Sequence, residues 1–280
     1  GLDPTEEEAS LNIEFGFFDP KESDFHGIRA LLASGGVGNS LLPSGAGFDV
    51  GGLAGCICEQ AAVGSIAKVI APGSEEPADP DDVLGFLSAI NLHAHRTKTF
   101  AKELLHSFTG RCADGVLSEA NVKMKKLLDA PTSGLIVSAR MLNLPPALVP
   151  DLYDSLLQDI TWAVENCDEV AERESFGFTH LILVCSCQQI ADPGGGGGSS
   201  SSAGGGGGGG KKKKKQKSAR AAAAFLESLE FARPEEEVLA AAAEWSVLLN
   251  AHGKERQLLL SLTPEAIRNA IPALRGVCAA

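Results

Sequence analysis

Two cysteine pairs, Cys56-x-Cys58 and Cys185-x-Cys187, have side chains that could hold a metal ion. Four thiolates are a common ligand set for structural zinc, but zinc knuckles place about two to four residues between paired cysteines. One intervening residue does not match that spacing. Cys185 and Cys187 would also share one face of an apolar strand, which is typical of core residues. The sequence therefore predicts that Cys185 and Cys187 are core residues and that the cysteines form no metal site.

The histidines and carboxylates do not form a recognisable catalytic set. His93 and His95 end a predicted strand without an evident third ligand, so a polar strand end is the simpler interpretation. His180 lies inside a predicted apolar strand, which favours a hydrogen-bonded core histidine. Acidic runs at 6–8 and 235–237 are typical of solvated surface and of charge at a helix N-terminus. Without a G-x-S-x-G elbow for a nucleophilic serine, we predict no catalytic residue and no cofactor.

The stretch Gly205–Lys211 satisfies the G-x-x-x-x-G-K pattern of a phosphate-binding loop. A Walker A loop continues with Ser or Thr, whose hydroxyl holds magnesium, whereas Lys212 stands at that position. A run of glycines also matches any glycine pattern by accident. We therefore expect no phosphate loop here.

Residues 192–218 are predicted to be a disordered insertion, because Gly and Ser bury no side chains and lose much backbone freedom when ordered. The insertion ends in six lysines: Lys211, Lys212, Lys213, Lys214, Lys215 and Lys217. Such a cluster is typical of a nuclear import signal or a nucleic-acid patch, and the alternative is a solvated charge run lengthened by repeat expansion. Import is favoured, since an import signal must be accessible.

The chain has 280 residues, of which 44% are hydrophobic, and a net charge of −12. Without the six lysines, 18 basic residues face 36 acidic ones, so the remainder is strongly acidic. An acidic body favours basic partners and repels nucleic acid, so we predict no nucleic-acid binding except weak binding through the lysines. No apolar run is long enough for a membrane helix, and seven cysteines without framework spacing indicate reduced thiols. Because Gly1 is not a methionine, we expect a segment of unknown length upstream.

Hydrophobic patterning predicts alternating strands and helices. The predicted strands cover 11–19, 64–70, 83–93, 133–142, 177–187 and 258–262. The predicted helices cover 23–32, 56–63, 99–108, 116–129, 147–165, a segment from Pro234, and 263–276. Ser23 or Asp24 would cap the first helix and Thr263 the last, while 35–52 would be a loop. This alternation indicates an α/β or α+β fold with a mixed sheet between helices. We expect an acidic flexible lead-in at 1–10 and one globular domain at 11–280, interrupted by the insertion.

Several segments, in consistent order along nearly the whole chain, resemble the BCCIP/BCP family of nuclear proteins. They are IEFGFFDPKESDFHGIRALL, VGSIAKV, VLGFLSAINL, GLIVSARMLNLPPALVPDLYDSLLQDI, KKKKKQK with FLESLEFARPEEEVL, and RQLLLSLTPEAIRNAIPAL. The most specific is 134–160, where an apolar strand, S-x-R, N-x-P-P and an amphipathic helix follow one another. The long Gly/Ser tract and the loop at 35–52 depart from the family.

The resemblance implies a fold similar to that of GNAT acetyltransferases, without the activity. It also implies a non-enzymatic nuclear chaperone or adaptor that escorts a basic ribosomal protein of the large subunit in ribosome biogenesis. Nuclear export, shuttling to the cytoplasm and nuclear transport receptors as partners belong to this expectation. Arg140, Asn143, Pro145 and Pro146 match the family motif. We interpret them as structural: the prolines fix an extended turn, and Arg140 either pairs with an acid across the sheet or contacts a client.

Two other functions stay open. The first is a scaffold that binds cell-cycle or DNA-repair proteins, as the family also implies. The second is an acyltransferase that uses acetyl-CoA, suggested by analogy of fold alone. That fold grips pyrophosphate with backbone N–H groups at a strand-to-helix turn, and the comparable junction here, NLPPALVPDLY, has prolines that lack such donors.

Overall fold

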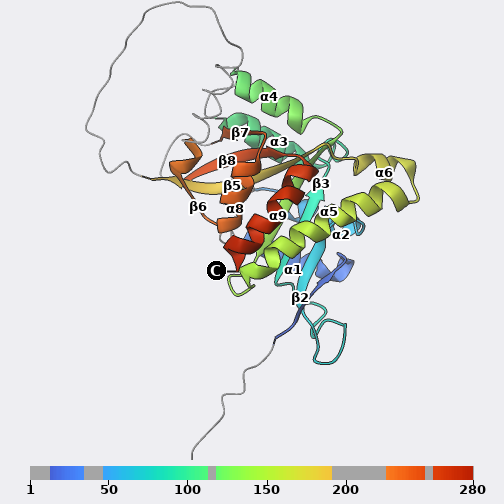
Figure 1. The fold of residues 1–280 in the computed structure, drawn as a ribbon. Coiled ribbons are helices and arrows are strands. Elements are labelled where there is room, and N and C mark those ends of the chain that lie inside the picture. The colour runs from blue at the N-terminus through green and yellow to red at the C-terminus, as the bar shows by residue number, and fades with distance from the viewer. Residues whose placement is uncertain (1–12, 35–46, 113–117, 191–224, 250–254, 280) are drawn as a thin grey trace, which may run out of the picture.

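The chain forms one mixed β-sheet with helices on both faces (Figure 1), and the computed structural model describes residues 13–34, 47–112, 118–190, 225–249 and 255–279. The strands are β1 (Phe15–Phe18), β2 (Ser65–Val69), β3 (Gly85–Ile90), β4 (Ser133–Arg140), β5 (His180–Gln189), β6 (Leu229–Phe231), β7 (Trp245–Leu248) and β8 (Glu255–Leu262). Their order is β1-β2-β3-β4-β5-β8-β7, and β6 also pairs with β5. The pairing of β4 with β5 is parallel and the other pairings are antiparallel. The predicted mixed α/β fold is confirmed, whereas similarity to the GNAT fold stays a prediction.

Two helical layers cover the two faces of the sheet. One layer contains α1 (Phe25–Ala33), α2 (Val50–Glu59), α3 (Thr99–Arg111) and α4 (Glu119–Leu128), and the other contains α5 (Val149–Asn166), α8 (Pro234–Ala242) and α9 (Pro264–Cys278). The short helix α6 (Val170–Ser175) follows α5, and the 3-10 turns η1 (Glu22–Asp24) and η2 (Pro146–Leu148) precede α1 and α5. Alternate residues of β5 point to opposite layers, so Leu181 and Leu183 pack with α5 while Ile182 and Val184 pack with the α1–α4 layer. The prediction that this strand is buried on both faces is confirmed.

Several local predictions were wrong. The predicted loop at 35–52 ends earlier, because α2 already begins at Val50 with Asp49 accepting a hydrogen bond from the Gly52 amide at 2.8 Å. Asp24 stands at the N-cap of α1 without a capping hydrogen bond, because its carboxylate is buried and bonds Lys68 Nζ at 2.5 Å. The strands β6 and β7 and the helix α6 were not predicted, since each is too short for a clear hydrophobic period. The cap at Thr263 is confirmed: its hydroxyl oxygen accepts from the Ala266 amide at 3.1 Å.

The chain leaves β5 and returns to it at the same place. Gln189 is paired with Leu229, and the Ile190 amide donates to the Ser228 carbonyl at 3.0 Å. Strands before and after 191–224 therefore belong to one sheet. The predicted insertion at 192–218 and the lead-in at 1–10 lie outside the described residues.

The strands β4 and β5 diverge after a short parallel pairing that runs from Ser133 to Leu135 on β4. Because β8 pairs along the opposite edge of β5, β6 must occupy the edge that β4 leaves. The chain continues directly from β6 into α8, whose first turn faces the gap. The sheet thus opens at its centre, and the residues that line the opening come from β3, β4, β5, α5 and the start of α8.

Candidate functional site

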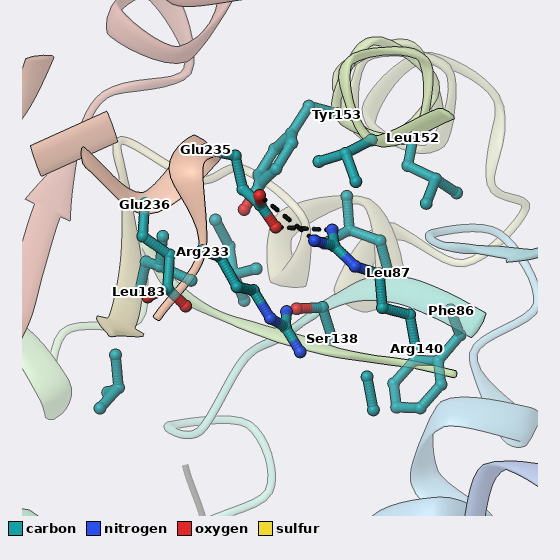
Figure 2. Close-up of a pocket in the computed structure, with 14 residues that line it drawn as sticks. Phe86, Leu87, Ser138, Arg140, Leu152, Tyr153, Leu183, Arg233, Glu235 and Glu236 are labelled. Carbon is teal, nitrogen blue, oxygen red and sulfur yellow. Dashed lines mark hydrogen bonds and ion pairs between the residues drawn. The ribbon is translucent and has the colours of Figure 1, made fainter. Parts of the chain in front are cut away.

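The opening between β4 and β5 is filled by a buried ion pair. Arg140 at the end of β4 donates to Glu235 on the first turn of α8, with Nη1–Oε1 at 2.6 Å and Nη2–Oε2 at 3.3 Å. Figure 2 shows the two side chains pointing toward each other, with Tyr153 of α5 beside Glu235. The Glu235 side chain is 3% exposed and that of Arg140 is 16% exposed. Two parallel hydrogen bonds fix both geometry and charge. Of the two roles left open for Arg140, the structure shows a pairing with an acid, although that acid lies on α8 and not across the sheet.

Glu235 and Glu236 were predicted to be solvated, which is wrong, since their residues are 2% and 4% exposed. Burial raises the pKa of Glu236 to about 8, although the neighbouring Arg233 lowers it. Its Oε2 atom has no hydrogen-bond partner among the described residues. Glu237, the third residue of the run, is exposed as predicted. Three consecutive acids at a helix start are typical of charge at a helix N-terminus, so the run itself does not indicate burial. The signal for burial would have been the two arginines that neutralise these acids, Arg140 and Arg233.

The remaining cavity in this ionic cluster measures about 30 Å³ and is lined in part by Tyr153, Arg233 and the Arg140–Glu235 pair. Such a volume has room for a water molecule or two and not for an organic ligand. Burial also holds the pKa of Tyr153 well above its usual value, so the phenol stays protonated. The cluster is therefore part of the core that joins β4, α5 and α8.

The rest of the family motif forms the link from β4 to α5. Asn143 is exposed, and Pro145 has an extended backbone with φ −57° and ψ 128°. Pro146 begins the 3-10 turn η2, which leads directly into α5. The two prolines thus sit where the strand must end and the helix begin, which agrees with a structural role.

A groove with acidic walls lies where α5, α6 and the end of α2 meet. Its volume is about 720 Å³, and its lining residues are Asp19, Glu59, Ala61, Ala62, Asp159, Trp162, Asn166, Cys167, Asp168 and Glu172. Five of the ten are carboxylates and none is basic. Glu59 already pairs with Lys98 at 3.0 Å, on the surface. No ion pair within the described ranges involves the other four carboxylates.

The acidic groove combines repelling carboxylates with an exposed aromatic ring. Burial raises the pKa of Asp159 to about 6; its hydrogen bond from the Gly64 amide at 3.2 Å opposes this rise, and the charge of Asp19 adds to it. Trp162 is 55% exposed, which is unusual for so large an apolar side chain. A cation entering the groove would relieve the repulsion and could stack on the indole. Sequence reasoning missed this groove, because its residues are spread from β1 to α6.

The cysteine pairs do not converge on one site. Cys56 packs in the layer of α1–α4, whereas Cys185 and Cys187 pack on the opposite face of the sheet with α5. Burial raises the pKa of Cys56 to about 12 and that of Cys58 to about 11, so these thiols are protonated. Within the described ranges, no three His, Cys, Asp or Glu side chains are grouped so that they could hold a metal ion.

The histidines differ from their predicted places. His93 and His95 lie in a turn after β3, where His93 Nδ1 bonds the Asp129 carbonyl at 2.8 Å. His180 is the first residue of β5 and its side chain is 36% exposed, at 3.6 Å from the Glu244 carboxylate. The interpretation of His180 as a core histidine was therefore wrong, because the strand begins later than its hydrophobic pattern suggested.

Two sequence features cannot be placed. Lys211–Lys215 and Lys217 lie outside the described residues, as does the glycine run that mimics a phosphate loop. Among the described helices, none is both long and apolar enough to cross a membrane.

A model of the BCCIP family matches residues 10–239, which is most of the chain. The chain belongs to the BCCIP family. It is 28% identical to the Protein BCCIP homolog of Arabidopsis thaliana, over 98% of this chain and 75% of that protein. It is 33% identical to the Protein bcp1 of Schizosaccharomyces pombe, over 62% of this chain and 56% of that protein. The predicted family membership is confirmed.

Among solved structures, the crystal structure of BCP1 from Saccharomyces cerevisiae is similar in fold. The TM-score is 0.58 and the sequence identity 18%, over 97% of this chain and 93% of that one. At this identity the likeness shows the fold alone. The chain spans just over half the length of several fungal BCCIP relatives, so the activity and partners of the whole protein are proposals.

Proposed function

We propose that the chain is a non-enzymatic adaptor of the BCCIP family, which escorts a basic ribosomal protein of the large subunit in the nucleus and during nuclear export. Membership in the family supports an adaptor role in general. The observation that carries the finer proposal is the acidic groove, with its five carboxylates and exposed Trp162.

The groove suits a basic protein segment for electrostatic reasons. Lysines and arginines that bind ribosomal RNA in the ribosome are exposed on a free ribosomal protein. Carboxylates that repel one another, such as Asp19 and Asp159, gain from an incoming cation. The net charge of −12 extends the attraction beyond the groove and speeds the encounter.

Trp162 adds apolar contact and selectivity. A guanidinium group stacks on an indole ring more readily than an ammonium does. The client segment is therefore expected to contain arginine. The lysine run at 211–217 acts in this proposal as the import signal that nuclear transport receptors bind.

The test is co-expression of the chain with individual large-subunit ribosomal proteins, followed by co-purification at moderate salt. One client should stay soluble in a stoichiometric complex. The double variant Asp168→Asn/Glu172→Gln and the single variant Trp162→Ala should each lose most of that complex without a change in melting temperature, since all three side chains are exposed. The control is Glu227→Gln/Glu230→Gln, which removes the same charge from exposed residues outside the groove.

Other outcomes would favour other functions. Equal weak binding to every basic protein, unaffected by the groove variants, would mean that the acidic charge serves solubility and not client binding. Partners from DNA repair or cell-cycle control that stay bound when ribosomal proteins are absent would favour the scaffold.

A further inference from the structure

A tight turn after β4 presents a bulky apolar side chain to solvent. Leu142 is 84% exposed and Met141 43%. The Leu144 amide donates to the Met141 carbonyl at 3.2 Å, which places Leu142 and Asn143 at the two central positions of the turn. Gly, Pro, Asn, Asp and Ser dominate such positions, because they suit the turn backbone. An exposed leucine at this position does not contribute to the stability of the fold.

The turn is held rigidly from both sides. The Met141 amide donates to the Leu84 carbonyl at 2.8 Å, and Leu144 is buried in a small cluster with Leu84 and Ala67. Pro145 follows immediately and restricts the backbone further. Leu142 is therefore presented in one orientation, and a partner that binds it pays little for ordering the turn.

The turn forms one wall of a groove of about 640 Å³. The opposite wall is a stripe at helical spacing, which consists of Gly27, Ala30 and Leu31 of α1 and its C-cap residue Ser34. Gly27 lets α1 approach the segment that leads into β3, because a Cβ atom there would lie 2.6 Å from Val83 Cβ. The groove is thus bounded by small and aliphatic side chains.

Apart from Arg140, the charged residues that line this apolar groove are acidic. Asp81 and Asp82 belong to its lining, and the loop at 71–82 carries five carboxylates and no lysine or arginine. Arg140, the cation among the lining residues, is engaged by Glu235 at 2.6 Å. Arg29 of α1 lies by helical position on the side away from the stripe.

We propose that this groove is a docking site for a protein segment that places an aliphatic side chain beside lysine or arginine. The aliphatic side chain covers Leu142 and Met141, and the cation reaches Asp81 or Asp82. The groove shares no lining residue with the acidic groove, so it is a second site that stands independently of the proposed function.

The experiment measures binding of labelled peptides to the full chain by fluorescence anisotropy. The probe is a peptide in which leucine and lysine alternate on a glycine–serine background. One matched peptide has alanine for each leucine, and another has glutamate for each lysine. We expect the probe to bind about tenfold or more tightly than the alanine peptide, since burying one leucine has roughly that effect. The glutamate peptide should also bind more weakly, because Asp81 and Asp82 repel its carboxylates.

Variants assign the binding to the groove. Leu142→Gln should weaken the probe about tenfold, and Asp81→Asn/Asp82→Asn should weaken it and reduce its salt dependence. Val122→Gln, at a 46% exposed position on α4, is the control and should have no effect. Melting temperatures should not change, because these side chains are exposed.

Three results would overturn the proposal. The first is equal binding of the leucine and alanine peptides to the unmodified chain. The second is unchanged affinity in Leu142→Gln. The third is a dimer of this chain that depends on Leu142 and excludes the peptide, measured by sedimentation, since a second copy would then be the occupant. The variant Asp168→Asn/Glu172→Gln should keep the dependence on leucine, which separates this test from that of the acidic groove.

Discussion

At the scale of single residues, an ion pair fills the central opening of the sheet. The Arg140–Glu235 pair joins β4 to α8 by two hydrogen bonds, with Glu235 buried and Arg140 partly buried. Because both charges lose solvation, such a pair contributes only modestly to the free energy of unfolding. Removing one partner, however, leaves the other charge unpaired in a largely buried place. The pair therefore matters most for holding the start of α8 against the end of β4.

We expect Glu235→Ala to lower the free energy of unfolding by about 3 kcal/mol. The double variant Arg140→Met/Glu235→Met should recover most of this loss, because it removes both charges and refills the space. Urea unfolding of the two variants checks the prediction. A single variant as stable as the double one would show that Arg140 finds another partner or water.

Glu236 should make stability depend on pH. Its pKa is about 8 in the folded chain against 4.5 for the ordinary side chain, so the folded state binds more protons between these values. Stability from this group is present at low pH and is lost as pH rises toward 8, at about 1.4 kcal/mol per pH unit.

Glu236→Gln should remove that dependence and be more stable than the unmodified chain at pH 8 or above. Thermal unfolding between pH 6.5 and 8.5 is the measurement, because Asp159 titrates lower, at about 6. Glu237→Gln, its exposed neighbour, is the control. An unchanged slope in Glu236→Gln would mean that Arg233 keeps the carboxylate ionised.

At the scale of elements, β5 and β6 form a hairpin whose two ends meet. Gln189 and Leu229 are paired, so the pairing closes a loop between these two residues. The entropy of closing a loop grows slowly with its length. The sheet can therefore carry a long insertion at this place at small cost.

Deletion of residues 192–218 should leave the fold intact and raise the free energy of unfolding by about 1 kcal/mol, because a shorter loop closes more easily. Urea unfolding measures this. The same deletion should abolish nuclear accumulation of a fluorescent fusion, whereas deletion of the Gly/Ser part alone should not. Marked destabilisation would mean that the segment packs on the domain.

At the scale of the whole molecule, charge is unevenly distributed. The folded body is acidic, and six lysines are concentrated in one short run. Long-range attraction to a basic client is screened by salt. The binding energy from apolar contact with Trp162 is not screened by salt.

The association rate of the client should fall about tenfold or more when salt rises from low to near-molar concentration. Stopped-flow fluorescence of Trp162 gives the rate, with Trp162→Ala to identify the signal. Asp168→Asn/Glu172→Gln should start slower and depend less on salt. A rate that is independent of salt would show that electrostatic steering plays no part.

The amino-acid sequence was sufficient to predict the mixed α/β class, the buried strand β5, the cap at Thr263 and membership in the BCCIP family. These follow from local periodicity, capping chemistry and motif order, which act over a few residues or along one chain. The three-dimensional structure was needed to show that Glu235 and Glu236 are buried, that Cys56 and Cys185 lie on opposite faces of the sheet, and that carboxylates from β1 to α6 share one groove. Each of these depends on contacts between residues far apart in sequence, for which spacing along the chain carries no signal.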